Sequence, residues 1–305
     1  MLQAGKRLPL APGTVRLGID LGGTKIEGVV IAADGTIVDH RRVPTERERG
    51  YEYIVARVAA LVATLMASAP GVERVGIGTP GATSTHTGML KNSNTVCLNG
   101  RSLHVDLAAR IGVPVRLEND ANCFAVAEAR LGAGRGAAVV FGVILGTGVG
   151  GGIVVDGGVW PGLQHIAGEW GHHTLDPAGP ACYCGRRGCV ETFLCGPALE
   201  AQYLDASGST CTAAEIDRRR GAGDPQAANV LTTYLERFGR ALGNVINILD
   251  PTVVVLGGGL SNLDLLYAEG RAAVARHVFN DALQTPILRH ELGDSAGVIG
   301  AALLD

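Results

Sequence analysis

Hydrophobic runs along the chain alternate with glycine-rich turns, and two stretches repeat the same order of features. Residues 15–35 (VRLGIDLGGTKIEGVVIAADG) are typical of a strand, a glycine turn, a second strand and a closing turn. Residues 137–158 follow the same order, with a strand at 138–145, a glycine turn at 146–152 and a strand at 153–155. The recurrence of one supersecondary unit in both halves predicts a duplicated architecture.

The rest of the pattern predicts an alternation of strands and helices. Helices are expected at 54–68, 103–111, 122–131, 196–207, 212–220, 225–249 and 296–304, and strands at 74–78, 113–117, within 251–262 and at 286–292. This alternation is typical of an α/β fold. We expect an N-terminal α/β domain at 14–120 and a C-terminal α/β domain at 121–293 that includes a helical region. A final helix at about 294–305 would pack back onto the first domain.

Composition narrows the function classes. Of the 305 residues, 47% are hydrophobic and 18% are charged, and the formal net charge is −3. This composition excludes a disordered chain and gives no electrostatic footprint for nucleic acid or an anionic membrane. The uncharged stretch 136–155 could span a bilayer by length, but its clustered glycines and β-branched residues predict two strands. Because residues 1–13 lack an apolar signal segment, we expect a cytoplasmic protein with no nucleic-acid or membrane partner.

Four glycine turns are candidates for phosphate binding, at 20–25, 78–81, 145–152 and 256–259. Glycines let backbone N–H groups converge on an anion, and Asp20 at the end of an apolar strand suits hydrated Mg²⁺. The alternative for any single turn is that it merely closes a hairpin. The G-x-G-x-x-G spacing at 146–151 precedes a strand rather than a helix, which excludes a nicotinamide dinucleotide site, and the sequence lacks the P-loop signature. ATP held between two hairpin turns fits best.

Asp120 is the candidate general base of a phosphoryl transfer. It lies in ENDANC, after an apolar strand and before a helix, where α/β sheets present ligands. A kinase needs a group that accepts the proton of the attacking hydroxyl. The same position suits a helix N-cap, and the residues alone favour neither role over the other.

A cysteine cluster predicts a metal site. Three of the seven cysteines, Cys182, Cys184 and Cys189, are crowded into CYCGRRGC, and His172 and His173 lie shortly before them. Three thiolates and one imidazole are a typical ligand set of tetrahedral structural zinc. Free surface thiols and a thioredoxin-like pair are the alternatives, and the C-x-C spacing disfavours the second of these.

Taken in order, DLGGTK, ENDANC, the GTGxGGG turn, AGEWGHH, CYCGRRGCVE and LGGGLSN resemble the ROK family of sugar kinases. The resemblance covers nearly the whole chain from about Val15. It implies the actin-like (ribonuclease H-like) ATPase fold, a duplicated two-domain α/β fold with nucleotide and sugar in the cleft between the domains. It also implies a homodimer.

By this resemblance, three groups of residues carry the function. ATP would contact Gly18, Asp20, Gly22, Gly23, Thr24, Lys25, Gly146, Thr147, Gly148, Gly150, Gly257, Gly258 and Gly259. The hexose would contact Asn94, Asn119, Asp120, Glu169, His172 and Glu191, with Asp120 as the general base. The structural Zn²⁺ would be held by His172, Cys182, Cys184 and Cys189. The expected cofactors are therefore ATP, Mg²⁺ and Zn²⁺.

The segments 91–100 (KNSNTVCLNG) and 182–193 (CYCGRRGCVETF) look similar to bacterial fructokinases of the mannokinase/fructokinase type. This likeness implies fructose as the acceptor and fructose 6-phosphate as the product. A glucokinase, a mannokinase and an N-acetylmannosamine kinase are the alternatives within the family. A non-catalytic sugar-sensing regulator is the alternative from another class. It is disfavoured because about 14 residues precede the first strand, too few for a helix-turn-helix.

Overall fold

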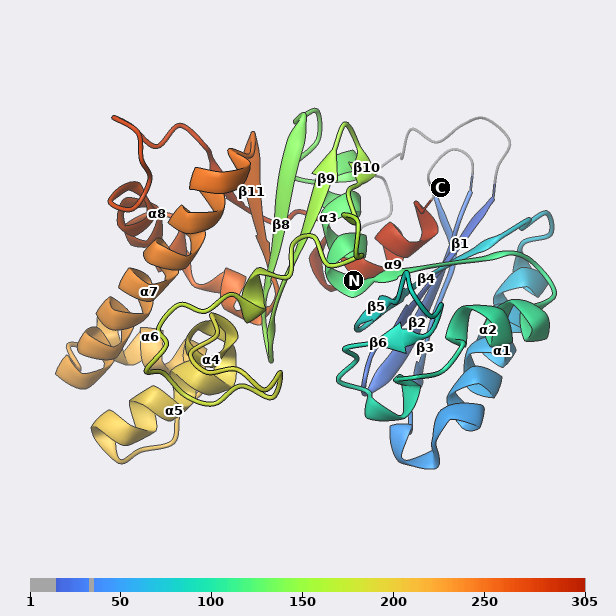
Figure 1. Cartoon of the computed structure of the whole chain (residues 1–305), viewed down its shortest axis with the longest axis horizontal. Coiled ribbons are helices and arrows are strands. Elements are labelled where there is room, and N and C mark those ends of the chain that lie inside the picture. The colour runs from blue at the N-terminus through green and yellow to red at the C-terminus, as the bar shows by residue number, and fades with distance from the viewer. Residues whose placement is uncertain (1–14, 33–35, 305) are drawn as a thin grey trace. The chain divides into compact units, whose positions relative to one another are not determined.

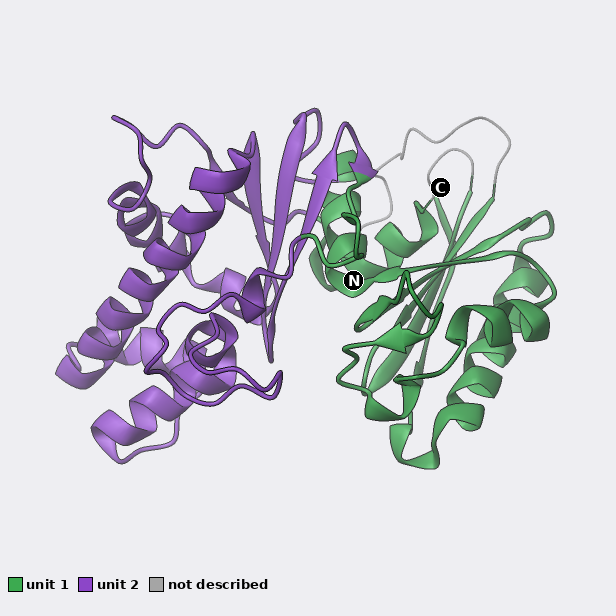
Figure 2. Cartoon of the chain, viewed as in Figure 1, with its two compact units in different colours: residues 1–131, 159–167, 292–305 green, residues 132–158, 168–291 purple. Residues whose placement is uncertain are grey.

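The computed structural model describes residues 15–32 and 36–304, which form two compact units (Figure 2). Unit 1 comprises Met1–Leu131, Val159–Ala167 and Leu292–Asp305, and unit 2 comprises Gly132–Gly158 and Gly168–Glu291. The segment tested above for an export signal, the closing turn expected at 33–35 and residue 305 lie outside the described residues. The first segment of unit 1 runs one helix past the domain boundary expected at residue 120, because helix α3 (Asp120–Leu131) packs within that unit.

Unit 1 is built on a five-stranded mixed sheet in the order β3-β2-β1-β4-β7. Its strands are β1 (Arg16–Leu21), β2 (Lys25–Ile31), β3 (Ile37–Pro44), β4 (Val75–Thr79) and β7 (Val115–Asn119). The first three form an antiparallel meander, while β1, β4 and β7 run parallel. A short hairpin of β5 (Ala82–Thr83) and β6 (Leu90–Lys91) follows β4.

Helix α1 (Tyr51–Ser68) and helix α2 (Leu103–Ile111) close the main hydrophobic core of unit 1. Among the described residues, α1 is the one helix long and apolar enough to cross a membrane. Its side chains at Ile54, Val58, Leu61 and Leu65 are buried against Ile19 and the other core residues of the sheet. The apolar face of α1 is therefore accounted for by packing inside the unit.

Unit 2 repeats the strand plan of unit 1, with a five-stranded sheet in the order β10-β9-β8-β11-β12. Its strands are β8 (Val139–Leu145), β9 (Val149–Val155), β10 (Gly158–Val159), β11 (Val253–Gly257) and β12 (Ile287–Arg289). Again an antiparallel hairpin is followed by parallel neighbours, β11 beside β8 and β12 beside β11. The predicted α/β class and the predicted duplication are confirmed.

The glycine turn expected at 146–152 is shorter than predicted, because β9 already begins at Val149. Glycines enter the strand here for a packing reason. A Cβ atom on Gly151 would lie 2.7 Å from Cδ1 of Trp170 and 2.8 Å from the carbonyl oxygen of Gly168. Residues 168–170 lie directly on the strand, so only a residue without a side chain fits at that position.

Helices fill the rest of unit 2 (Figure 1). They are α4 (Glu191–Leu194), α5 (Gly196–Ser207), α6 (Ala213–Gly221), α7 (Pro225–Leu249) and α8 (Glu269–Ala275). The long helix α7 has the bounds that the sequence predicts, and side-chain capping fixes its start. Asp224 caps it by accepting hydrogen bonds from the N–H groups of Gln226 and Ala227, and Pro251 follows its end.

The C-terminal helix α9 (Ala296–Ala302) packs on unit 1, against β1, β4 and α3. The contact is between backbones. A Cβ on Gly18 of β1 would lie 2.3 Å from the Val298 carbonyl oxygen, and one on Gly76 of β4 would lie 1.8 Å from that of Ala301. Gly300 of α9 approaches α3 in the same way, since its Cβ would lie 1.7 Å from the Cys123 carbonyl oxygen.

We expect Gly300→Ala to destabilise the protein by about 1–3 kcal/mol or more, because the methyl group would force α9 away from α3. The measurement is the free energy of unfolding in urea. Gly221→Ala in α6 is the matched control, since nothing lies within 4 Å of its Cβ position, and it should leave the stability nearly unchanged. Equal effects of the two substitutions would refute the backbone contact.

Candidate functional site

Polar residues gather in unit 1 where the parallel strands β1, β4 and β7 end. Asp20 is paired in register with Gly78, and Thr79 with Asn119, after which Asp120 begins α3. The carboxyl ends of parallel strands are where α/β sheets bind ligands. The structure thus brings Asp20 close to the adjacent pair Asn119 and Asp120, which follows it by about a hundred positions in the sequence.

The side chain of Asn119 caps helix α3. Its Oδ1 accepts hydrogen bonds from the N–H groups of Ala121 at 2.9 Å and of Asn122 at 3.3 Å. Its Nδ2 donates to the Gly81 carbonyl oxygen at 3.1 Å, which leaves one amide hydrogen for another acceptor. The Oδ1 of Asp120 also lies 2.9 Å from the Ala121 nitrogen. The capping role that the sequence left open for Asp120 is therefore largely taken by its neighbour.

Asp20 is a carboxyl group that resists ionisation. Its burial, the nearby charge of Asp120 and then that of Glu27 raise its pKa to about 7, although Lys25 and Arg42 act in the opposite direction. A divalent cation bound here would reduce the repulsion between these carboxylates. The position therefore suits the Mg²⁺ role predicted for Asp20.

Glu27 is a residue of this site that the sequence analysis did not identify. It lies opposite Asp20 in the β1–β2 ladder and is 1% exposed. Its carboxylate accepts hydrogen bonds from Lys25 at 3.1 Å, Arg42 at 2.8 Å and Ser295 at 3.1 Å, and its Oε1 lies 2.8 Å from His40 Nε2. Burial opposes ionisation, but the hydrogen bonds from Arg42, His40 and Lys25 lower its pKa to about 2. A single charge inside the apolar strand KIEGVVI was the signal that could have revealed it.

The first glycine turn joins β1 to β2. The Gly22 N–H donates to the Lys25 carbonyl oxygen at 3.0 Å, and the Thr45 hydroxyl donates to the Gly22 carbonyl oxygen at 2.7 Å. Lys25 lies beside this turn and is 44% exposed. Gly18, predicted for the nucleotide, is buried under α9, where its missing side chain allows the close approach described above.

The glycine turns at 145–152 and 256–259 lie side by side in unit 2, after the neighbouring strands β8 and β11. The Gly146 N–H donates to the Gly148 carbonyl oxygen at 3.0 Å and closes the turn that contains Thr147. Gly257 is in register with Ile144, and Gly258 has a φ of 79°. A Cβ on Gly258 would lie 2.4 Å from the Leu145 carbonyl oxygen, and Gly259 follows it.

Glu169, His172 and Glu191 lie around the start of β9. The Glu191 Oε2 accepts a hydrogen bond from the Val149 N–H at 2.9 Å. Trp170 donates from Nε1 to the Gly150 carbonyl oxygen at 2.9 Å, which holds the 3₁₀ turn Trp170–His172 on the strand. Glu169 immediately precedes that turn. The three residues predicted for the sugar in unit 2 therefore share one region with the glycine turn at 145–152.

His172, Cys182, Cys184 and Cys189 form a compact group. One ligand atom from each lies within 4.8 Å of the others, and the group contains His172 rather than His173. The Sγ atoms of Cys184 and Cys189 are 3.6 Å apart, and Cys182 Sγ is 3.6 Å from His172 Nδ1. Tetrahedral zinc with bonds of about 2.3 Å to sulfur would separate two thiolates by roughly 3.8 Å, so the donor set and its spacing fit that ion.

The thiols of this group differ in acidity. Burial opposes ionisation of Cys184, but hydrogen bonds from the Arg186 backbone and from the other two thiols lower its pKa to about 6. Burial and the hydrogen bonds with Cys184 and Cys182 raise the pKa of Cys189. His172 turns Nδ1 toward Cys182 and places Nε2 at 3.0 Å from the Tyr183 hydroxyl. A metal bound through Nδ1 would leave Nε2 able to hydrogen-bond.

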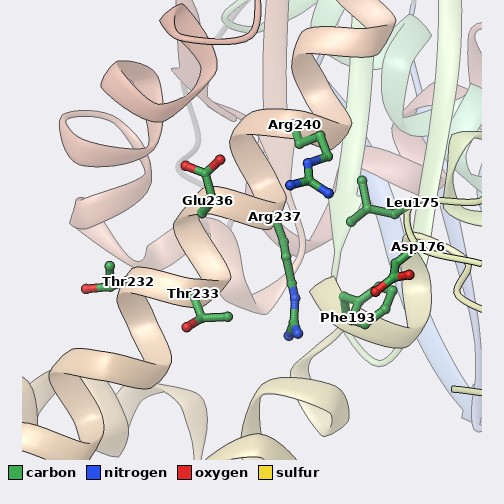
Figure 3. A pocket seen from close by; sticks show the side chains of 8 residues that line it. All are labelled: Leu175, Asp176, Phe193, Thr232, Thr233, Glu236, Arg237 and Arg240. Atoms are coloured by element: carbon green, nitrogen blue, oxygen red, sulfur yellow. The ribbon is translucent and has the colours of Figure 1, made fainter. Parts of the chain in front are cut away.

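A separate groove of about 420 Å³ lies on unit 2 between α7 and the loop before α4 (Figure 3). Arg237 stacks on Phe193 there and hydrogen-bonds Gln202, and the Glu236 carboxylate is bound by Arg276 and His277. None of the residues predicted for the nucleotide, the sugar or the metal lines it. The groove therefore stands apart from the candidate site.

Comparison with solved structures defines the class of the protein. The ROK hexokinase of Thermus thermophilus is 36% identical, with a TM-score of 0.85 over 95% of this chain and 97% of that one. A ROK glucokinase of Streptomyces griseus, solved with glucose and AMPPNP, is 31% identical, with a TM-score of 0.78 over 95% of this chain and 98% of that one. The fold is that of the actin-like two-domain ATPases, in the class of ATP-dependent sugar kinases.

The sequence comparisons give the family. Residues 16–305 match the model of the ROK family, and the chain belongs to it. The N-acetyl-D-glucosamine kinase of Aliivibrio salmonicida is 39% identical over 299 residues, which is 94% of this chain and 98% of the relative. The enzyme of the same name from Yersinia enterocolitica is 37% identical over 297 residues, again with 94% and 98% coverage.

The pKa of Asp20 predicts a pH-dependent effect of Asp20→Asn on stability. The pKa of about 7 in the folded state exceeds the ordinary value of 3.8, so wild-type stability should fall as the pH rises from about 4 to 7. Asp20→Asn has no carboxyl group to ionise and should not show this loss. The unfolding free energy of the variant relative to wild type should therefore be roughly 1–3 kcal/mol more favourable at pH 8 than at pH 4, measured by urea unfolding in EDTA. Asp39→Asn is the contrasting control. Burial raises the pKa of Asp39, but hydrogen bonds from Arg41 and Ser68 and the charge of Arg41 together lower it, so that substitution should not stabilise. A pH-independent difference between wild type and Asp20→Asn would contradict the assignment.

Proposed function

We propose that the protein transfers the γ-phosphoryl group of ATP to a primary hydroxyl of a hexose, with Asp120 accepting the hydroxyl proton. The observation that carries this proposal is the placement of Asp120 beside Asp20, at the carboxyl ends of β1, β4 and β7. Asn119 takes much of the capping of α3, so the Asp120 carboxylate is not required for that structural role.

The other residues bind and orient. Asp20 would hold a hydrated Mg²⁺, and Lys25, oriented by the buried Glu27, would face the nucleotide phosphates beside the turn at 22–24. Bound Mg-ATP supplies the phosphoryl group and neutralises its charge. In unit 2, Glu169, His172 and Glu191 would bind sugar hydroxyls, and Glu191 would also keep the turn at 146–148 in place through the Val149 N–H.

The acceptor we propose first is N-acetyl-D-glucosamine. Relatives 37–39% identical over 94% of this chain carry that activity in their names, and they support an N-acetylated amino sugar better than the fructose expected from sequence motifs. Fructose remains the second candidate, because the segments 91–100 and 182–193 resemble fructokinases. Pocket discrimination between related sugars is often small, so direct competition between acceptors is the decisive test.

We also propose that His172, Cys182, Cys184 and Cys189 hold a structural Zn²⁺. The donor set, its spacing within 4.8 Å and the lowered pKa of Cys184 support it. Four protein ligands leave no open position, so the ion would fix the loop between Glu169 and Glu191 rather than act on substrate. The homodimer, the cytoplasmic location and the exact domain bounds stay predictions.

The kinase proposal is tested by ADP release from MgATP with N-acetyl-D-glucosamine, fructose, mannose, glucose and N-acetylmannosamine as acceptors, compared by kcat/KM. We expect N-acetyl-D-glucosamine to lead, and Asp120→Asn to lower kcat about 10²–10⁴-fold with the melting temperature preserved. A lead for fructose would replace the acceptor and keep the base. Full activity of Asp120→Asn would remove Asp120 from the mechanism.

The zinc proposal is tested by metal analysis of the purified protein. We expect one Zn²⁺ per chain in the wild type and its loss in Cys189→Ser, together with a lower melting temperature and weaker sugar binding. Cys211→Ser, a buried cysteine outside the group, is the control and should retain the metal. Equal zinc content in both variants would refute the site.

A further inference from the structure

The turn at 22–24 offers unused hydrogen-bond donors. The Gly22 N–H is bound to the Lys25 carbonyl oxygen, but the N–H groups of Gly23 and Thr24 have no hydrogen-bond acceptor within residues 15–32 and 36–304. Consecutive free N–H groups in a turn form a concavity that favours an anion. This turn is the one expected at the nucleotide phosphates.

Thr95 places a second unused donor at the same turn. The residue is 2% exposed, and its Oγ1 has no hydrogen-bond partner among the residues that the structure describes. This oxygen lies 3.5 Å from the point where a Cβ on Gly23 would be. Leaving a buried hydroxyl without a partner is unfavourable, so a bound ligand that accepts its hydrogen bond would explain the arrangement. Asn94, expected to contact the sugar, is the preceding residue.

Arg47 brings a positive charge to this point. It begins the 3₁₀ turn Arg47–Arg49, and its Nη1 lies 3.6 Å from the same Cβ position on Gly23. Its guanidinium makes no hydrogen bond or ion pair in the part of the chain that the structure describes. The neighbouring carboxylate of Glu46 is already bound by Arg49, Arg57 and Tyr53, so it does not neutralise Arg47.

We propose that Arg47 and Thr95 are contact residues for the phosphoryl group in transfer. The proposal rests on the proposed kinase function and adds two residues to those predicted for the nucleotide and the sugar. Two N–H groups, the Thr95 hydroxyl and the Arg47 guanidinium converge at Gly23, since the last two lie 3.5 and 3.6 Å from its Cβ position. A phosphoryl group has several charged oxygens and can accept from all of them at once.

The proposed reaction is the transfer of the γ-phosphoryl group from ATP to a sugar hydroxyl. A bond forms between the sugar oxygen and the γ-phosphorus, the bond from that phosphorus to the ADP oxygen breaks, and the hydroxyl proton goes to Asp120. Negative charge is then spread over the three remaining oxygens of the group. Donors fixed in advance at this point stabilise that charge without reorganising during the reaction.

The first test is Arg47→Ala, assayed with MgATP and the best acceptor. We expect kcat to fall on the order of 100-fold, with the KM for sugar changed far less, and Arg47→Lys to recover part of the loss. Arg49→Ala is the matched control, because it lies in the same 3₁₀ turn and is paired with Glu46. It should retain wild-type kcat.

The second test is Thr95→Val, which keeps the shape and removes the hydroxyl. A merely structural Thr95 would leave kcat unchanged. The proposal expects kcat to fall about tenfold while the melting temperature stays equal or rises, because an unsatisfied buried hydroxyl has been removed. Unchanged kcat in Thr95→Val would overturn the role of Thr95.

A binding measurement separates this inference from the kinase proposal. Titration of wild-type protein with magnesium tripolyphosphate should give an affinity that falls about tenfold in Arg47→Ala and not in Arg49→Ala. If the wild type shows no turnover but Arg47→Ala still binds tripolyphosphate more weakly than Arg49→Ala, the kinase proposal is refuted and the anion-binding role of Arg47 is kept. Equal tripolyphosphate affinity and equal kcat in the two alanine variants would overturn the role of Arg47.

Discussion

Both units depend on backbones that touch where a side chain would not fit. In unit 1, Gly18, Gly76 and Gly300 let α9 lie directly on β1, β4 and α3. In unit 2, Gly151 and Gly171 let the segment around Trp170 lie on β9, with a Gly171 Cβ position only 2.0 Å from the Val149 carbonyl oxygen. Close packing leaves no slack at such contacts, so the polar residues attached to them are held in place.

In unit 1 this packing concentrates negative charge. Asp120 and Glu27 lie close enough to Asp20 to raise the pKa of its carboxyl group. The surroundings of Glu27 and Asp20 differ. Glu27 is surrounded by Arg42, His40, Lys25 and Ser295 and stays ionised, whereas Asp20 has a pKa near 7. One carboxylate is therefore satisfied by the protein itself, while Asp20 favours an added cation. At the turn 22–24 the condition is the reverse, because the Arg47 guanidinium and the Thr95 hydroxyl are donors without acceptors in the described part of the chain.

In unit 2 the same arrangement links three features that are separate in the sequence. Glu191 follows Cys189, the last cysteine of the candidate metal group, by two positions, and it accepts a hydrogen bond from the Val149 N–H at the glycine turn 145–152. His172 belongs both to the candidate metal group, with Cys182, Cys184 and Cys189, and to the 3₁₀ turn Trp170–His172 that lies on β9. A metal that orders this loop would thus position sugar-facing residues and a phosphate turn together, which is why its removal is expected to weaken sugar binding.

Local features of the sequence were sufficient to predict the α/β class, the repeated hairpin, the bounds of helices α2, α5 and α7, and the cysteine group. These properties depend on periodicity, turn residues and ligand spacing, which are set by residues close together in the chain. The tertiary structure decided the rest. It gave the capping role to Asn119, packed Gly18 against α9, extended β9 back to Val149 and revealed Glu27, Arg47 and Thr95. Each of these depends on atoms far apart in sequence, since burial, orphaned donors and backbone contacts exist only once the strands and helices have packed.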